Sequence, residues 1–99
     1  MNTKNLDHII TRLSDKKEYL RKKYFIREIG VFGSYVRHEQ GTSSDLDVLV
    51  DFEKPISLLR FVELEAELSE VTGLDVDLVS REALKPHMGE SVRREVIFV

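Results

Sequence analysis

The chain has 99 residues, of which 41% are hydrophobic and 33% charged, and this size predicts a single domain over residues 1–99. It contains no cysteine, which excludes disulfides, thiol catalysis and thiolate zinc sites. The net charge of −3 argues against binding to long nucleic acids, and without a long apolar run or a signal-peptide core we expect no membrane association and a cytoplasmic location.

The first half of the chain predicts a helix and two strands. Residues 4–23 carry apolar side chains at helical spacing and predict an amphipathic helix. The apolar segment at residues 26–32 predicts the first strand. Residues 34–39 are expected to form a short helix or turn, residues 40–44 a loop, and residues 46–52 the second strand.

The second half predicts a helix, a strand, a last helix and a terminal apolar segment. Residues 57–71 form the helix, and Gly73 stands where a left-handed helix end is typical. Residues 74–80 alternate in polarity and predict the third strand. Pro86 suits the first position of the last helix, and residues 96–99 are either a short core strand or a partner-binding patch, of which we favour the strand. The helix at residues 57–71 is expected to have an apolar stripe formed by Leu58, Phe61, Leu64, Leu68 and Val71.

This order of elements predicts an α/β (α+β) fold. A small mixed sheet of three to four strands would be backed by the helices, because each element must bury one apolar face. The relative direction of the first two strands stays open, since the link between them is short.

Two carboxylates open the second predicted strand. Asp45 and Asp47 are two residues apart, so in an extended strand they point the same way, about 6–7 Å apart. Asp47 lies in an otherwise apolar segment, where an unpaired buried carboxylate costs several kcal/mol. Asp45 alone could also be a turn or cap residue. For Asp47, we expect a cation that compensates its charge.

A third carboxylate, Asp77, interrupts the third predicted strand. If the second and third strands are neighbours, Asp45, Asp47 and Asp77 converge at one sheet edge. Hard divalent cations such as Mg²⁺ prefer several oxygen ligands and keep positions open for water and phosphate. Asp75 shares the face of Asp77 and is the alternative acid, whereas Asp51 lies about 13 Å beyond Asp47, too far for the same metal.

A Gly-Ser pair closes the first predicted strand. Gly33 permits a positive φ and a close approach of the backbone, and free N–H groups at a strand end bind phosphate. The simpler alternatives are a tight turn at Gly33 and a helix N-cap at Ser34. Carboxylates for Mg²⁺ beside N–H groups for phosphate are the chemistry of nucleotide transfer.

The interval from Gly33-Ser34 across ten residues to Asp45-Leu46-Asp47-Val48 resembles the signature of the DNA polymerase β-like nucleotidyltransferase superfamily. With the later segment 76–79 and the short chain, it is similar to the minimal nucleotidyltransferase (MNT) family. Members are stand-alone domains and often antitoxins paired with HEPN-domain toxins. The resemblance implies the polymerase β-like nucleotidyltransferase fold.

The resemblance also implies roles for individual residues. The acids would be catalytic and would ligate Mg²⁺, with two ions expected, and the third acid would share the metal or act as the base. The Gly-Ser pair would hold the β- and γ-phosphates of ATP. The implied catalytic and metal residues are Asp45, Asp47 and Asp77, and the implied phosphate-binding residues are Gly33, Ser34 and Arg37.

Arg37 and His38 lie in the segment that follows the Gly-Ser pair. Arg37 stands at the family's arginine position, and its alternative role is a surface ion pair with Glu39 or Asp45. His38 stands where the family usually has glycine. If a positive φ is needed there, histidine tolerates it less well than glycine, so the turn is expected to differ.

The function implied by the resemblance is Mg²⁺-dependent transfer of AMP from ATP to a hydroxyl, with a tyrosine of a HEPN toxin as acceptor. The chain would then be an antitoxin and part of a hetero-oligomer with that toxin. The alternatives are an antitoxin that binds and occludes its partner without catalysis, and a small-molecule nucleotidyltransferase. The sequence leaves open the nucleotide base, the acceptor residue, the number of transfers and the oligomeric state.

Overall fold

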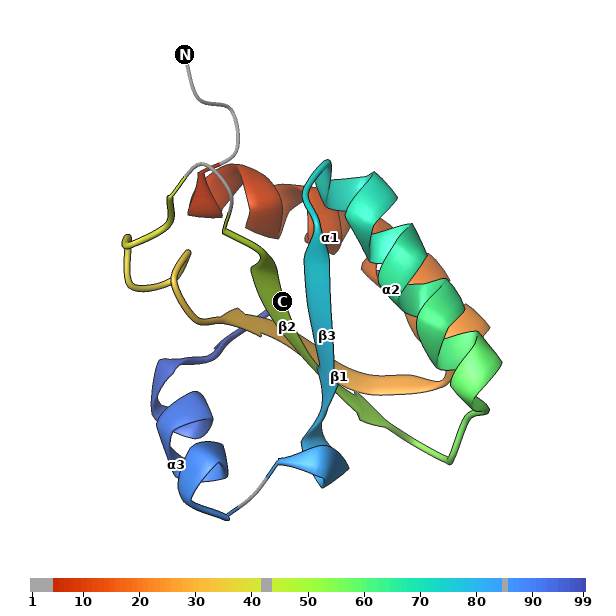
Figure 1. The fold of residues 1–99 in the computed structure, drawn as a ribbon. Coiled ribbons are helices and arrows are strands. Elements are labelled where there is room, and N and C mark those ends of the chain that lie inside the picture. The colour runs from red at the N-terminus through yellow and green to blue at the C-terminus, as the bar shows by residue number, and fades with distance from the viewer. Residues whose placement is uncertain (1–4, 42–43, 85) are drawn as a thin grey trace.

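The computed structural model describes residues 5–41, 44–84 and 86–99, with the backbone alone described at residues 86–88. Within these ranges helices and strands follow one another as Figure 1 shows. In chain order they are α1 (Leu6–Tyr24), β1 (Ile26–Phe32), β2 (Leu46–Phe52), α2 (Leu58–Thr72), β3 (Val76–Ser80), the 3₁₀ helix η1 (Arg81–Ala83), α3 (Pro86–Glu95) and β4 (Ile97–Phe98).

The four strands form one mixed sheet in the order β3-β2-β1-β4. β1 pairs in antiparallel fashion with both β2 and β4, whereas β2 and β3 run parallel. Because parallel neighbours need a crossover connection, α2 serves as that crossover. The predicted α/β fold with a mixed sheet of three to four strands is confirmed, and the first two strands are antiparallel.

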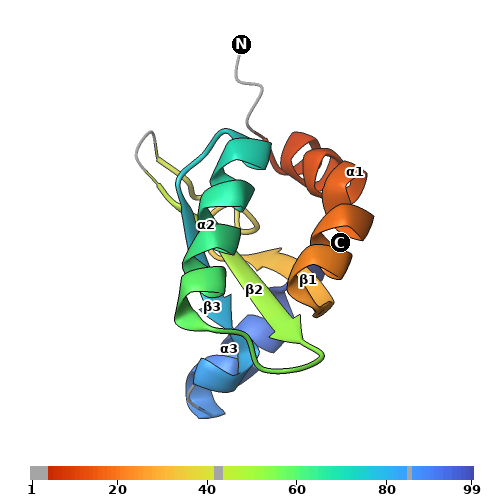
Figure 2. The same cartoon turned by 90° about the vertical axis from the view of Figure 1, so that its right-hand side faces the viewer.

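One face of the sheet carries the hydrophobic core. Figure 2 shows α1 and α2 together on this side of the strands and α3 on the other. On β2, Leu46, Val48 and Val50 are fully buried in this core. Since successive strand residues point to opposite faces, Asp47 and Leu49 lie on the second face. The helix residues buried in the core are Ile9, Leu13, Leu20, Tyr24, Leu64 and Leu68.

The helix ends largely agree with the sequence prediction. The Asn5 side chain caps α1 by accepting the His8 N–H, and Ser57 caps α2. Gly73 ends α2 with a φ of 72°, which confirms the predicted left-handed end. No helix in the described ranges is both long and apolar enough to cross a membrane.

Two details of the second half of the chain were predicted wrongly. Leu58 is 78% exposed, because six residues separate it from the buried Leu64 and place it about a third of a turn away from the core. The third strand begins at Val76 rather than at Leu74. The Leu74 N–H instead donates to the Thr72 hydroxyl, which ties this residue to the end of α2.

The C-terminal elements cover part of the second sheet face. α3 begins at Pro86 as predicted, and its Val92 is buried. β4 pairs with the C-terminal part of β1, with Ile97 opposite Val31. The terminal strand is therefore confirmed, although Phe98 is 51% exposed and lies outside the core.

Candidate active site

Two of the three predicted acids are direct neighbours across strands. Asp47 of β2 and Asp77 of β3 are register partners in the parallel ladder, and both lie on the face away from α1 and α2. Asp45 is exposed and lies one residue before β2 begins. The condition set by the sequence, that the second and third strands must be adjacent, is met.

Asp47 lies in an environment that disfavours its charge. Burial, followed by the nearby charges of Asp77 and Asp45, raises the pKa of Asp47 to about 6, although Arg37 acts in the opposite direction. No hydrogen bond to the Asp47 carboxylate occurs within the described part of the chain. A partly buried carboxylate without a partner, beside two others, is an arrangement that a cation would stabilise.

The alternative acid, Asp75, is differently placed. It precedes β3, and its backbone carbonyl accepts the Leu46 N–H at 2.8 Å. The charges that raise the Asp47 pKa come from Asp77 and Asp45, with a smaller contribution from Glu95, and Asp75 is not among them. The geometry therefore favours Asp77 over Asp75 as the third acid.

The Gly-Ser turn, residues 33–39, follows directly after β1. The Gly33 carbonyl accepts the N–H groups of Val36 and Arg37, and the Ser34 carbonyl accepts that of Glu39. Gly33 has a φ of 83°, and a Cβ added there would overlap the Asp47 carboxylate. Both the conformation and the contact require glycine, so this turn and the acid on β2 form one site.

Ser34 does not start a helix, since residues 34–38 form a hydrogen-bonded turn. The alternative of a helix N-cap therefore does not apply. Among the described residues, no acceptor is found for the backbone N–H groups of Ser34 and Tyr35. These two N–H groups can donate to an anion that enters the turn.

His38 has a positive φ, which the sequence analysis considered as a possible requirement of this turn. Its φ is 59°, within the left-handed region that glycine adopts without strain. The turn thus has a left-handed residue at this position although the residue is histidine and not glycine.

Arg37 is held by two carboxylates. Its Nε donates to Glu39 at 3.1 Å and its Nη1 to Glu95 at 2.6 Å. The same Glu95 oxygen accepts the Gly33 N–H at 2.7 Å. The expected ion pair with Glu39 is present, but no contact with Asp45 is. Sequence reasoning missed Glu95, because it lies on α3, far along the chain, and carries no motif.

A three-residue metal cage is not present in the described ranges 5–41, 44–84 and 86–99. The predicted ligands Asp45, Asp47 and Asp77 influence one another electrostatically but are not gathered as ligands of one ion. This does not conflict with Mg²⁺, which is usually bound by one or two carboxylates together with waters and substrate phosphates. The oxygen donors present suit that mode of binding.

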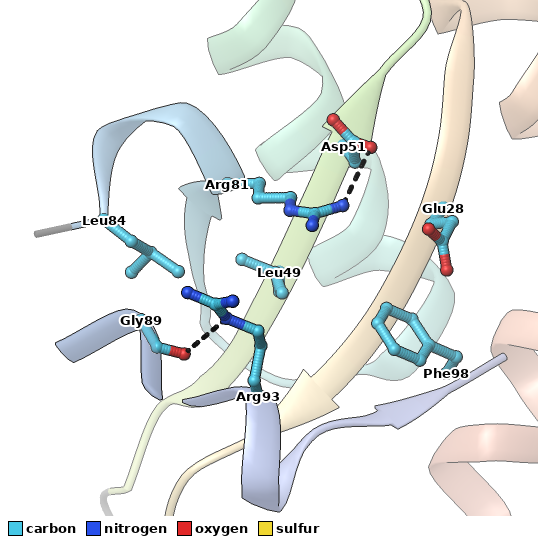
Figure 3. Close-up of a pocket in the computed structure, with 8 residues that line it drawn as sticks. All are labelled: Glu28, Leu49, Asp51, Arg81, Leu84, Gly89, Arg93 and Phe98. Atoms are coloured by element: carbon cyan, nitrogen blue, oxygen red, sulfur yellow. Dashed lines mark hydrogen bonds and ion pairs between the residues drawn. The ribbon is translucent and has the colours of Figure 1, made fainter. Parts of the chain in front are cut away.

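A pocket of about 330 Å³ lies further along the same sheet face (Figure 3). Leu49 forms its floor, and Arg81 and Arg93 extend toward it from η1 and α3. Asp51 pairs with Arg81 at 3.5 Å, so this acid belongs to the pocket and not to the predicted metal site. None of the predicted site residues lines the pocket, and we therefore define the candidate active site by the acids and the Gly-Ser turn.

Sequence comparison gives a family for most of the chain. The family model for the nucleotidyltransferase domain matches residues 13–99. The protein adenylyltransferase MntA of Thermococcus cleftensis is 50% identical over 94 residues, which cover 95% of this chain and 95% of that protein.

Structure comparison gives similar folds. A structure assigned to a minimal nucleotidyltransferase matches with a TM-score of 0.74 and 35% identity, over 90% of this chain and 93% of that one. A complex of a tri-AMPylated Shewanella oneidensis HEPN toxin with an MNT antitoxin contains a chain that matches with a TM-score of 0.65. This second match covers 91% of this chain and 70% of that one at 21% identity, and it shows the fold alone.

Proposed function

This chain belongs to the nucleotidyltransferase domain family, and we propose that it transfers AMP from ATP to a tyrosine hydroxyl of a HEPN-domain toxin. The observation that carries the proposal is the contact between the Gly33 turn and Asp47, with Asp77 on the adjacent strand. Backbone N–H groups that suit phosphate thus lie beside carboxylates that suit a divalent cation. Residues 1–99 would form a single minimal nucleotidyltransferase domain.

The reaction would be a displacement at the α-phosphorus of ATP. The acceptor oxygen forms a bond to phosphorus, the bond from that phosphorus to the bridging oxygen breaks, and pyrophosphate leaves. The hydroxyl proton would pass to the Asp77 carboxylate, which is exposed. The N–H groups of Gly33, Ser34 and Tyr35, together with Arg37, would bind the leaving pyrophosphate.

The acids fit Mg²⁺, and Asp45, Asp47 and Asp77 would hold it. When bound, the ion would neutralise charge on the phosphates and on the attacking oxygen. The family usually employs two ions, and the carboxylates of both strands are available for them. Without the ion, burial and then repulsion from Asp77 and Asp45 raise the pKa of Asp47.

Partner and role are supported by the relatives. The Thermococcus relative at 50% identity is a protein adenylyltransferase, and a fold neighbour is in complex with a HEPN toxin that carries AMP groups. We therefore propose that this chain is a cytoplasmic antitoxin that forms a hetero-oligomer with a HEPN toxin and silences it by modification.

Intact-mass measurement tests the proposal. The chain is incubated with ATP, Mg²⁺ and the HEPN-domain protein encoded beside it, and the partner is then weighed. We expect a mass gain in whole AMP units that requires Mg²⁺ and is lost with Asp47→Asn. Neutralisation of the toxin by the Asp45→Asn, Asp47→Asn double variant would instead support occlusion without catalysis. AMP transfer to a small molecule and not to the toxin would support the small-molecule alternative.

A further inference from the structure

Glu95, the last residue of α3, lies in the phosphate-binding part of the candidate site. One of its carboxylate oxygens accepts the Gly33 N–H at 2.7 Å and the Arg37 guanidinium at 2.6 Å. The side chain is 19% exposed. A single acid on a distant element therefore contacts two of the groups expected to bind the nucleotide.

The contacts of this oxygen are those that a phosphate oxygen would make. Carboxylate and phosphate oxygens accept from the same donors, namely backbone N–H groups and guanidinium groups. The Gly33 N–H carries one proton, so it cannot serve Glu95 and a phosphate at full strength. Glu95 therefore occupies a position that the proposed function gives to the polyphosphate.

The charges around Arg37 point in the same direction. Glu95 and Glu39 both pair with its guanidinium, but only Glu95 also accepts the Gly33 N–H. Glu95 also stands at the C-terminal end of α3, where the helix dipole disfavours an acid. Its position is thus favoured by the turn and by Arg37 and opposed by its own helix.

We propose that Glu95 is an internal competitor of the nucleotide, a carboxylate that leaves the Gly-Ser turn when the β- and γ-phosphates bind and returns when pyrophosphate departs. The inference rests on the proposed function for the identity of the ligand. Competition of this kind weakens the binding of nucleotide and of pyrophosphate, and it speeds product release. Glu95 would then set how strongly the site holds polyphosphate.

Calorimetry with inorganic tripolyphosphate and pyrophosphate, in the presence of Mg²⁺, tests the competition. Glu95→Gln keeps the size of the side chain and removes its charge. We expect this variant to bind both ligands about tenfold more tightly than the wild type, because a charge-assisted contact no longer has to be broken. Weaker or unchanged binding would overturn the inference and leave Glu95 as a structural support of the turn.

Glu39→Gln is the matched control. Glu39 also pairs with Arg37, but it is 64% exposed and does not contact the Gly33 N–H. We expect its substitution to change the affinity for tripolyphosphate by no more than about twofold. A tenfold gain in this variant as well would show that only the charge on Arg37 matters, and competition at Gly33 would be refuted.

The amide signal of Gly33 in NMR spectra provides a direct readout. Tripolyphosphate should shift this signal in the wild type, and Glu95→Gln alone should shift it before any ligand is added. A Gly33 signal that does not respond to tripolyphosphate would contradict the exchange of one acceptor for another.

This experiment is separable from the proposed function. If AMP transfer is absent but Glu95→Gln binds tripolyphosphate more tightly, the competition holds and the proposed reaction fails. If transfer occurs and the affinity for tripolyphosphate does not rise in Glu95→Gln, the competition fails and the reaction stands. Absence of tripolyphosphate binding in both proteins would overturn the competition.

Discussion

Two partly buried carboxylates on opposite faces of the sheet have opposite surroundings. Glu67 of α2 accepts hydrogen bonds from the Tyr24 hydroxyl at 2.6 Å and the Lys23 ammonium at 3.0 Å. Burial alone would raise the pKa of Glu67, but the hydrogen bonds from its neighbours lower it. Asp47 has burial and the charges of Asp77 and Asp45 acting together, and its pKa rises to about 6.

The difference distinguishes a carboxylate that stabilises the fold from one that is suited to bind a ligand. On the helix-covered face each buried polar group near Glu67 has a partner, as is usual in protein interiors. On the other face the same chain leaves Asp47 uncompensated, at a cost to its own stability. Such unbalanced carboxylates occur where a ligand completes the structure.

The largest expected effect comes from Asp47→Asn. This change should lower the rate of AMP transfer by at least about 100-fold, since it removes a charge that the reaction requires. It should also stabilise the metal-free protein by about 1 kcal/mol, because a partly buried charge is removed and its repulsion with Asp77 disappears. Initial rates by mass spectrometry and urea unfolding measure the two effects. A variant that lost both activity and stability would contradict the comparison.

Glu67→Ala should have the opposite profile. We expect the free energy of unfolding to fall by about 1–2 kcal/mol, because the buried Tyr24 hydroxyl and the Lys23 ammonium lose their common acceptor. For a domain of this size that loss lowers Tm by about 4–8 °C per kcal/mol. Transfer activity should stay within about twofold of the wild type.

Glu63→Ala is the control on the same helix. Glu63 pairs with Arg60 at 3.0 Å but is 45% exposed, so its removal should cost less than about 0.5 kcal/mol. Equal destabilisation by the two substitutions would mean that the network around Glu67 has no special role.

The pH dependence of stability should differ between the wild type and Asp47→Asn. Because the pKa of Asp47 rises from 3.8 to about 6 on folding, the folded state binds this proton more tightly than the unfolded state. The metal-free wild type should therefore gain stability relative to Asp47→Asn as the pH falls from about 6 to about 4. Urea unfolding of both proteins between pH 4 and 8 measures the difference. A constant difference across this range would show that the carboxyl is not perturbed.

The smallest expected effect concerns the turn itself. His38 has a φ of 59°, so His38→Gly should stabilise the protein by about 0.5 kcal/mol, less than the relief of strain alone because glycine also loosens the unfolded chain. His38→Ala should give no gain, since alanine keeps the Cβ. Denaturant midpoints test the pair, and a gain for alanine equal to that for glycine would exclude strain as the cause.

Sequence reasoning could identify the site residues that have a local signal, but not those whose contacts depend on how distant elements pack. Asp47 could be identified locally, because its charge interrupts an otherwise apolar strand. The proximity of Asp77 followed only once β2 and β3 were known to be neighbours, which α2 decides by its crossover. Leu58 was wrongly predicted to be buried, because its spacing also fits a residue at the edge of the apolar stripe of α2. Glu95 could not be found, since its contacts with the Gly-Ser turn depend on how α3 packs.

The antiparallel register of β1 and β2 has a consequence for length variation. Phe32 pairs with Asp47, so the ladder itself places Gly33 beside the acid. Residues added next to Gly41 would lengthen the connection to β2 at a small entropic cost and leave both groups in position. One residue inserted within β2 would instead turn Asp47 into the core. The ten-residue interval in the motif is therefore a loop length, and homologous sites can keep their geometry while that number changes.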